Sequence, residues 1–442
     1  MDKVRLLALK IKDEIDFKRS YSQVQLSETL KDKDDLSRRD KALITELVSG
    51  SIRMQGSIDW MISNFASQPL SEMDLTQLNI FRLAIYQIIY IDNIPDYAAV
   101  DEAVNQTRNI LSNGLSKFTN GLLRNFLRNK KDLKWPSRDS NEVDYLSAFY
   151  SHPGWIVKKF IDDFGVEECE KILRADNQRP KVSLRVNTIK NTKDELLNEL
   201  NELGMTLEEN PCVDEAIIIE EGFFPHNIIS NGKAYAQDVS SMIVGHVVDP
   251  MAGESVIDMC SGPGGKATHL AQLMENNGKV IAVDKSKRRL AAIENSAKIL
   301  DINIIDLIMG DSSDPLELPI ADRVLVDAPC SGLGVLSRRP DLRWQRKPGD
   351  IADLQAIQMS ILSNSANYVR SGGTLVYSVC TFTKEETIGV VDHFLRSRDD
   401  FIEDDLSSLN VIDSAMAKKS QIQLMPYDKQ TDGMFIARFK KE

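Results

Sequence analysis

The stretch Val256-Ile257-Asp258-Met259-Cys260-Ser261-Gly262-Pro263-Gly264-Gly265-Lys266 decides the fold of this chain. Its first four residues predict a short buried strand, and three glycines and a proline follow. A strand that runs into a glycine-rich turn and then a helix is typical of a site for a nucleotide-like cofactor. Glycine lets a ligand approach the backbone, and the first N–H groups of the helix point at it. The segment is neither G-x-G-x-x-G nor a P-loop, because Ala267 follows Gly265-Lys266.

Acidic residues follow the next two predicted strands. Asp284 ends the strand after the glycine-rich turn, a position where a carboxylate can bind ribose hydroxyls. Asp311 follows the third strand, where we expect contact with an adenine amino group. Together with the turn, these acids predict a nucleoside cofactor.

The chain from about residue 235 alternates predicted strands with predicted helices, which indicates an open and mostly parallel Rossmann-like α/β sheet. Ligands are expected at the carboxyl ends of its strands. The predicted strands span residues 255–259, 280–284, 305–309, 322–327 and 374–378, with a last one near 434–438.

Two cysteines follow strands of this sheet. Cys330 comes after Asp327-Ala328-Pro329, and Cys380 comes after Tyr377-Ser378-Val379. A thiol beside a cofactor indicates covalent catalysis on an electrophilic ring, and C5 of cytosine becomes nucleophilic only after a thiolate has added to C6. A second group must then help to eliminate the thiolate, and an acid such as Asp327 must hold the N3/N4 edge of the ring. This chemistry leaves open which of the two cysteines attacks.

The remaining composition limits the class of protein. A chain of 442 residues with 42% hydrophobic and 27% charged residues is expected to form two or three globular domains. It has no apolar run of roughly 20 residues and no signal-peptide pattern, so we expect a cytoplasmic protein without a membrane partner. The five scattered cysteines form no CxxC pair, and the five histidines show no metal spacing. We therefore expect no metal, and packing roles for Cys169 and Cys212.

The net charge of −12 is unevenly distributed. Residues 1–150 carry 21 basic and 21 acidic side chains, so that part is neutral. Basic clusters lie in both halves, around 124–138, at 285–289 and at 338–347. A single cluster of this kind is most often a solvated face, but the last one follows Cys330, so we expect it to hold phosphates.

The pattern predicts three domains. Residues 1–135 have helical apolar spacing, and 136–149 are polar and predict a linker. Residues 150–234 form a small α+β domain, with strands at 182–187 and 215–220 around a helix at 193–203. Residues 235–442 form the Rossmann-like catalytic domain.

The three motifs Cys260-Ser261-Gly262-Pro263-Gly264-Gly265-Lys266, Asp327-Ala328-Pro329-Cys330-Ser331-Gly332-Leu333-Gly334 and Tyr377-Ser378-Val379-Cys380-Thr381 resemble those of the RNA 5-methylcytosine methyltransferases of the NOL/NOP2/Sun family. The chain is similar to the bacterial Sun/Fmu type within that family. The resemblance implies S-adenosylmethionine as cofactor and methylation of a cytosine in 16S rRNA. The substrate would be naked rRNA or rRNA in early small-subunit assembly.

The N-terminal part resembles a NusB-like RNA-binding helical domain. Segments such as Ser37-Arg38-Arg39-Asp40-Lys41 and Lys117-Phe118-Thr119-Asn120-Gly121-Leu122-Leu123-Arg124 carry this resemblance. The resemblance covers nearly the whole chain. It implies an all-α NusB-like domain, a small α+β (RRM-like) insert and a Rossmann-like methyltransferase domain.

The resemblance also implies roles for single residues. Cys380 would be the nucleophile, Cys330 would assist product release, and Asp327 would contact the N3/N4 edge of the base. Ser261-Gly262 stand where many members have two alanines, and Val379 stands where a threonine is common. The expected cofactor contacts are Cys260, Ser261, Gly262, Pro263, Gly264, Gly265, Lys266, Asp284, Arg289, Asp311 and Asp327. The expected RNA contacts are Arg38, Arg39, Arg124, Arg128, Arg338, Arg339 and Arg343.

Two rival functions stay open at this point. In DNA cytosine-C5 methyltransferases the Pro-Cys motif carries the nucleophile, which would be Cys330; the helical extension and the second strand-end cysteine favour RNA. A non-catalytic RNA-binding or ribosome-assembly factor would keep only the scaffold, and the intact set of Asp327, Cys330 and Cys380 favours an enzyme.

Overall fold

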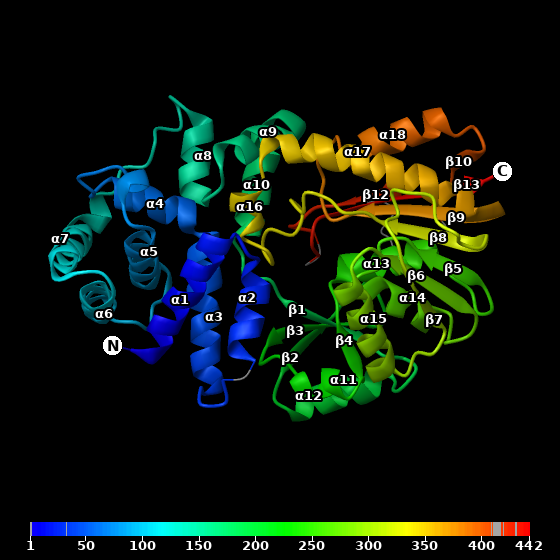
Figure 1. The fold of residues 1–442 in the computed structure, drawn as a ribbon, viewed down its shortest axis with the longest axis horizontal. Coiled ribbons are helices and arrows are strands. Elements are labelled where there is room, and N and C mark those ends of the chain that lie inside the picture. The colour runs from blue at the N-terminus through cyan, green and yellow to red at the C-terminus, as the bar shows by residue number, and fades with distance from the viewer. Residues whose placement is uncertain (1, 32, 408, 410–416, 419, 429–430) are drawn as a thin grey trace. The chain divides into compact units, whose positions relative to one another are not determined.

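A computed structural model describes the chain except for residues 1, 32, 408, 410–416, 419 and 429–430 (Figure 1). The chain divides into two compact units. The first unit comprises Met1–Gln178 together with Leu336–Arg346, and the second comprises Arg179–Val335 together with Lys347–Glu442. Within the described residues, no helix is both long and apolar enough to span a bilayer.

The described part of the first unit is helical. Its elements are α1 (Lys3–Lys18), α2 (Ser22–Leu30), α3 (Arg38–Arg53), α4 (Gln55–Ser63), η1 (Leu70–Glu72), α5 (Leu75–Tyr90), α6 (Asp96–Ile110), α7 (Asn113–Asn129), η2 (Lys130–Asp132), α8 (Glu142–Tyr150), α9 (Gly154–Phe164), α10 (Val166–Asp176) and α16 (Leu342–Gln345).

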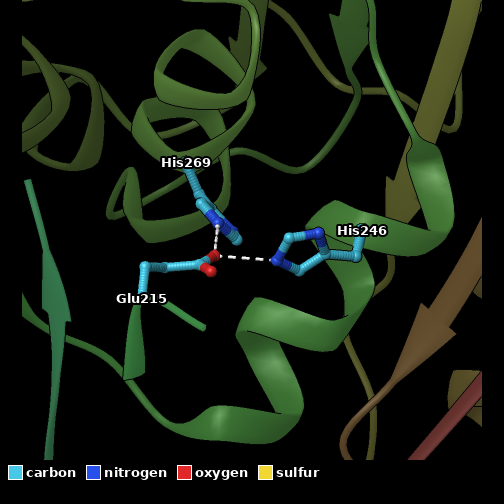
Figure 2. Close-up of side chains that lie close together, drawn as sticks. All are labelled: Glu215, His246 and His269. Carbon is cyan, nitrogen blue, oxygen red and sulfur yellow. Dashed lines mark hydrogen bonds and ion pairs between the residues drawn. The ribbon is translucent and has the colours of Figure 1, made fainter. Parts of the chain in front are cut away.

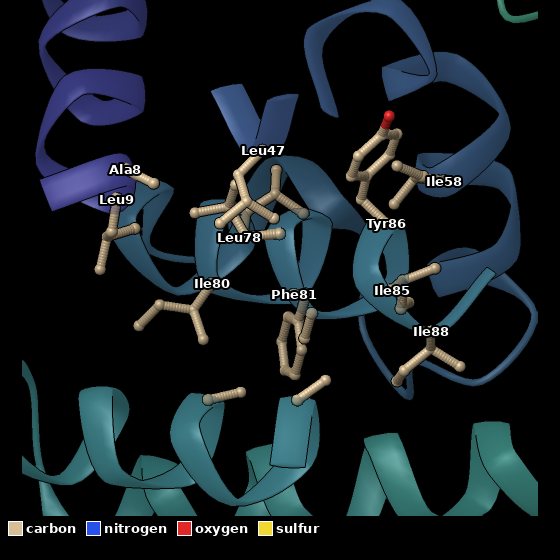
Figure 3. Packing of buried hydrophobic residues seen from close by; sticks show 14 of the residues in the cluster. Ala8, Leu9, Leu47, Ile58, Leu78, Ile80, Phe81, Ile85, Tyr86 and Ile88 are labelled. Carbon is tan, nitrogen blue, oxygen red and sulfur yellow. The ribbon is translucent and has the colours of Figure 1, made fainter. Parts of the chain in front are cut away.

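Helix α5 is the centre of the first unit. Every residue from 77 to 88 is buried, and helices α1, α3, α6 and α7 contact it. Apolar residues occupy consecutive positions of this helix, such as Leu83, Ala84 and Ile85, so neighbouring helices must cover more than one of its faces. Figure 3 shows Phe81, Ile85 and Ile88 in this packing. Asp74 caps its first turn by accepting a hydrogen bond from the Gln77 amide at 3.0 Å.

The segment predicted as a linker contains a packed helix. Helix α8 (Glu142–Tyr150) occupies the whole second half of residues 136–149, and its Leu146 and Tyr150 are buried. Ser57 of α4 donates to the carbonyl of Ala148 at 2.7 Å, and the Gly56 amide donates to Ser151 Oγ at 2.9 Å. These bonds join α8 to α4, and α9 and α10 contact α8. All three helices belong to the first unit, whereas the predicted division grouped residues 150–234 together.

The second unit begins with the small α+β region and continues into the large sheet. Its elements are β1 (Val182–Val186), α11 (Lys193–Glu202), β2 (Thr206–Glu209), β3 (Ala216–Glu221), α12 (His226–Ser230), β4 (Ala234–Ala236), α13 (Val239–Val248), β5 (Ser255–Asp258), α14 (Gly265–Leu273), β6 (Lys279–Asp284), α15 (Lys287–Leu300), β7 (Ile305–Met309), β8 (Ala321–Asp327), α17 (Pro348–Ser365), η3 (Ala366–Tyr368), β9 (Val369–Val379), α18 (Ile388–Ser397), β10 (Phe401–Glu403), β11 (Ala417–Lys418), β12 (Gln421–Leu424) and β13 (Met434–Lys441).

The small region contains a four-stranded antiparallel sheet in the order β2-β3-β1-β4. Leu184 of β1 pairs with Ile217 of β3, and both are fully buried. The predicted strand–helix–strand pattern is therefore confirmed as β1, α11 and β3. The exposed β2 and the three-residue β4 lack the alternation that would have predicted them.

The large sheet has the order β11-β12-β13-β9-β8-β5-β6-β7, with β10 paired to β13. Strands β5 to β9 pair in parallel, as predicted, and β13 joins β9 antiparallel. Strand β5 lies between β6 and β8, so successive strands run outward from it in both directions. Such a switch point is where open α/β sheets bind ligands, at the carboxyl ends of the strands.

Helices cover both faces of the large sheet (Figure 1). Val256 and Val280 pack into the cluster with α13 to α15, whereas Ile257 and Ile281 pack into the cluster with α17 and α18. Neighbouring residues of a strand point to opposite faces, so both must be apolar. This burial on two sides explains the continuous apolar runs in the sequence.

Candidate active site

The glycine-rich turn after β5 is held against the end of β6. The Ser261 amide donates to the Val283 carbonyl at 2.9 Å, and the Gly262 amide donates to Asp284 Oδ2 at 3.0 Å. A Cβ atom at Gly262 would lie 2.5 Å from that same oxygen, so only glycine permits this approach. The Ser286 amide donates to Asp284 Oδ1 at 2.8 Å, which fixes this carboxylate at the strand end.

Helix α14 continues the turn, and a buried arginine of the small sheet braces its start. Arg185 of β1 donates to the Gly265 carbonyl at 2.7 Å and to Thr268 Oγ1 at 3.0 Å. It also donates to Gln272 at 3.2 Å. Burial lowers the pKa of Arg185 to about 10, which leaves it cationic at neutral pH. Sequence reasoning missed this role, because Arg185 is distant from the turn in the chain.

Asp258, the last residue of β5, is a fully buried carboxylate at the base of the turn. Neither of its oxygens has a hydrogen-bond partner among the described residues. Burial, with the nearby charge of Asp327, raises the pKa of Asp258 to about 7. An unpaired buried carboxyl group favours a cationic ligand nearby. Together with the bare glycine backbone and the carboxylate of Asp284, it fits a cofactor that has both ribose hydroxyls and positive charge.

The other predicted cofactor residues lie along the same sheet edge. Asp311 follows β7 and lies 3.4 Å from Lys285 Nζ, and Arg289 Nη1 lies 3.7 Å from Asp284 Oδ2. Burial raises the pKa of the Cys260 thiol well above its ordinary value. Cys260 therefore stays protonated and lines the turn, and it does not act as a nucleophile.

Asp327 ends β8, and a lysine and a serine hold its carboxylate. Lys266 Nζ donates to Asp327 Oδ2 at 2.8 Å, and Ser378 of β9 donates to Oδ1 at 3.0 Å. Burial opposes the charged form of Lys266, but the carboxylate of Asp327 outweighs it and raises the pKa of Lys266. The ion pair joins the glycine-rich turn to the motif that carries Cys330.

The two strand-end cysteines meet beside this ion pair. Cys330 Sγ lies 3.2 Å from Cys380 Sγ. The hydrogen bond with Cys380 and burial raise the pKa of Cys330 well above its ordinary value, and the charge of Glu386 adds to this effect. The backbone closes the same contact, because the Gly334 amide donates to the Cys380 carbonyl at 3.0 Å. A Cβ atom at Gly334 would lie 2.9 Å from that carbonyl oxygen, so a side chain would push the two loops apart.

One predicted RNA contact is wrong. Arg343 is fully buried in the first unit, and its guanidinium donates to the carbonyl of Ser151 at 3.0 Å, to that of Asp176 at 3.1 Å and to Asn177 Oδ1 at 2.9 Å. Its neighbour Trp344 donates to the Ile52 carbonyl at 2.7 Å. A guanidinium that is buried and already bonded to carbonyls does not reach a phosphate.

The remaining predicted RNA contacts differ from Arg343 in their exposure to solvent. Arg38 and Arg39 are exposed in the first turn of α3, and Arg124 and Arg128 are exposed one turn apart on α7. In the segment 336–346, Arg339 is exposed and Arg338 is partly buried.

The fold brings two histidines onto one carboxylate, which sequence spacing did not reveal (Figure 2). His246 Nε2 lies 2.8 Å and His269 Nε2 lies 2.6 Å from Glu215 Oε1. Burial lowers the pKa of His269 to about 4, so a neutral ring donates to the carboxylate. His269 Nδ1 is buried with no partner among the described residues. If a metal were bound to Nε2 of His269, the proton of the ring would be on Nδ1, where it would have no acceptor. Hydrogen bonds to Glu215 therefore account better for this cluster.

Comparisons with known families match nearly the whole chain. Residues 245–440 match the family described as 16S rRNA methyltransferase RsmB/F. Residues 2–128 match the NusB family, and residues 152–224 match the RsmF/B-like ferredoxin-like domain. These matches confirm the predicted fold classes of an all-α domain, a small α+β domain and a methyltransferase domain.

Similar proteins and structures agree. The chain is 36% identical over 448 residues to the probable ribosomal RNA small subunit methyltransferase B of Bacillus subtilis (strain 168), which covers 99% of each chain. It is 32% identical over 409 residues to the ribosomal RNA small subunit methyltransferase B of Salmonella paratyphi A, which covers 91% of each. The crystal structure of PH0851 matches with a TM-score of 0.82 and 26% identity over 99% of this chain and 98% of that one.

A further solved structure, NSun6 from Pyrococcus horikoshii with SFG, matches with a TM-score of 0.59 and 26% identity. It covers 65% of this chain and 98% of that chain. The sequence, the domain set and the fold thus point to one class of enzyme: the chain belongs to the RsmB/F family of 16S rRNA methyltransferases.

Proposed function

We propose that this protein transfers a methyl group from S-adenosylmethionine to C5 of a cytosine in 16S rRNA, through a covalent bond between Cys380 and C6 of the ring. The single observation that carries this proposal is the distance of 3.2 Å between the sulfurs of Cys330 and Cys380, at the carboxyl edge of the parallel strands. One thiol suffices for addition to C6. A second thiol at contact distance is what an assisted elimination needs.

Cys380, Asp327 and Cys330 have different roles in this reaction. Cys380 attacks C6 as the thiolate, and the electron pair of the C5–C6 double bond is then available at C5. Asp327 accepts a hydrogen bond from the N4 amino group, the edge by which a carboxylate recognises cytosine. After C5 has gained its methyl group, a base removes the C5 proton, the Sγ–C6 bond breaks and the double bond re-forms. Cys330 keeps its proton, so it can donate a hydrogen bond to the departing sulfur of Cys380.

S-adenosylmethionine supplies the electrophilic methyl group when bound. Asp284 suits its ribose hydroxyls, and the bare backbone around Gly262 lets the ligand approach closely. Asp258 offers a buried carboxyl group to the positive charge of the cofactor. These features support a cationic nucleoside in preference to a dinucleotide phosphate.

The substrate follows from the family and the basic surface. Membership of the RsmB/F family supports rRNA over DNA as the substrate. Exposed arginines on α3 and α7 suit phosphates, and the target cytosine must leave its stack to reach a strand-end thiol, at a cost of a few kcal/mol. The predicted cytoplasmic location and the choice between naked rRNA and an assembly intermediate stay predictions.

The test is methyl transfer from labelled S-adenosylmethionine to unmodified 16S rRNA, free or in partly assembled small subunits. The digested RNA is then analysed by mass spectrometry of its nucleosides. We expect label in 5-methylcytosine alone. Label in another nucleoside contradicts the C5 chemistry, and label in DNA but not RNA favours the DNA-methyltransferase alternative. Absence of label with all substrates favours the binding factor.

A further inference from the structure

A buried carboxylate lies behind the two cysteines, outside the mechanism described above. Glu386 has 0% of its surface exposed and follows Cys380 by six residues. No lysine or arginine of the described chain forms an ion pair with it. A buried charge without a cation is costly unless hydrogen bonds satisfy it. The groups that donate hydrogen bonds to Glu386 therefore show which segments of the chain this carboxylate positions.

Both oxygens of Glu386 bind the loop of Cys330. The amide of Ser331 donates to Oε1 at 2.7 Å, and the hydroxyl of Ser331 donates to Oε2 at 2.6 Å. Gln358 of α17 donates to Oε1 at 3.0 Å and to the Pro329 carbonyl, also at 3.0 Å. The peptide on each side of Cys330 is therefore bonded to Glu386 or to its partner.

The same carboxylate also binds the loop of Cys380. Thr383 donates to Oε2 at 2.9 Å, and Thr381 lies 3.5 Å from Oε2. Ser331 and Thr381, the residues directly after the two cysteines, bond to each other at 3.0 Å. Glu386 thus lies at the junction of two loops that are fifty residues apart in the chain.

A role in starting helix α18 does not account for these bonds. Thr383 is close in sequence and can stabilise the turn before α18 (Ile388–Ser397). The two bonds from Ser331 come from 55 residues away, and a helix start needs no such partner. Charge-assisted hydrogen bonds are the strong ones, and in a buried site they fix geometry.

We propose that Glu386 is a positioning residue that holds Cys330 and Cys380 at contact distance. The proposal rests on the proposed function for its catalytic meaning, because only a two-cysteine mechanism needs this spacing. Without the carboxylate, the amide and hydroxyl of Ser331 lose their acceptor, and the Cys330 loop loses its link to Thr383. The negative charge of Glu386 also contributes to raising the pKa of the Cys330 thiol, after the hydrogen bond with Cys380 and burial.

The first test measures the spacing without methyl transfer. In a glutathione redox buffer, the two thiols lose two electrons and two protons to form one disulfide, and oxidised glutathione is reduced to two thiols. Peptide mapping by mass spectrometry then gives the Cys330–Cys380 disulfide fraction. We expect the effective concentration of the two thiols to fall at least about tenfold in Glu386→Ala. Asp392→Asn, an exposed acid on α18, is the matched control and should leave it unchanged.

The second test measures catalysis. For Glu386→Ala we expect kcat for rRNA methylation to fall about 10- to 100-fold, while KM for RNA and the affinity for S-adenosylmethionine stay near the wild-type values. Glu386→Gln keeps the volume and one acceptor oxygen, so it should restore part of kcat. An unchanged disulfide equilibrium, or an unchanged kcat, in Glu386→Ala overturns the proposal.

Ser331→Ala separates positioning from a folding defect, because it removes one hydroxyl and keeps the carboxylate. We expect the same direction of change in both tests, and a double variant Ser331→Ala/Glu386→Gln whose effect is less than additive. Additive effects contradict action through Ser331. If the disulfide equilibrium shifts but the wild-type protein methylates no RNA, the proposed function fails and the positioning role stands.

Discussion

The sulfur atoms of Cys330 and Cys380 lie 3.2 Å apart, although fifty residues separate them in the chain. Parallel pairing of β8 with β9 places the ends of these strands side by side, and the bond from the Gly334 amide to the Cys380 carbonyl closes the remaining gap. The pair is therefore a product of sheet topology and of one glycine that leaves room for the contact.

The two cysteines should differ in what their removal does. Cys380→Ala should abolish methyl transfer while S-adenosylmethionine still binds, because no thiol then adds to C6. Cys330→Ala should accumulate an RNA adduct that survives denaturing gel electrophoresis, because elimination is no longer assisted. Cys212→Ala, in the small α+β region, is the control and should behave as wild type. An adduct with Cys380→Ala instead would exchange the two roles.

Arg343 should matter for stability and not for RNA. Arg343→Met leaves several buried carbonyls without donors, so we expect a loss of about 3 kcal/mol from the first unit. Arg339→Ala, exposed in the same segment, should change stability by less than about 0.5 kcal/mol. Urea denaturation followed by tryptophan fluorescence reports this unit alone, since it holds all of the chain's tryptophans: Trp60, Trp135, Trp155 and Trp344. Equal stability of the two variants contradicts the structural role.

Asp258 should make stability fall as pH rises. Its pKa is raised from 3.8 to about 7 by burial, so between these values the folded protein holds a proton that the unfolded chain releases. This contribution is full below about pH 4 and is lost as pH rises through 7. Relative to Asp258→Asn, the wild type should lose roughly 4 kcal/mol across that range, as measured by urea denaturation with circular dichroism. Parallel pH curves for the two proteins would exclude the shift.

The exposed arginines of α7 should contribute to RNA binding through charge alone. Arg124→Ala/Arg128→Ala should weaken binding of 16S rRNA and reduce the slope of log K against log salt by about 0.7 to 0.9 for each lost phosphate contact. The double variant Lys171→Ala/Arg174→Ala on α10 removes the same charge elsewhere. A loss of affinity of the same size in both double variants would indicate a general charge effect and no docking site on α7.

The sequence determined the elements of the catalytic sheet. Apolar runs such as Val280 to Val283 predicted its parallel strands, and the spacing of Gly262, Gly264 and Gly265 predicted the turn between β5 and α14. These predictions succeeded because apolar runs and glycine-rich turns depend on residues that are close together in the chain. The carboxyl ends of parallel strands lie at one edge of the sheet. The sequence therefore also predicted that the acids and thiols after these strands lie along that edge.

Only the tertiary structure decided which charged residues are buried and what they hold. Arg343 lies in a basic run that predicts a solvated or RNA-binding face, yet carbonyls from distant helices surround it. Glu386 follows the Cys380 motif without any pattern that marks it, and its role depends on Ser331 and Gln358. The role of Arg185 likewise depends on hydrogen bonds to distant residues of α14. That of Asp258 depends on the absence of a hydrogen-bond partner for its two oxygens among the described residues. Burial of a charge depends on what packs against it, and neighbours in sequence do not record that.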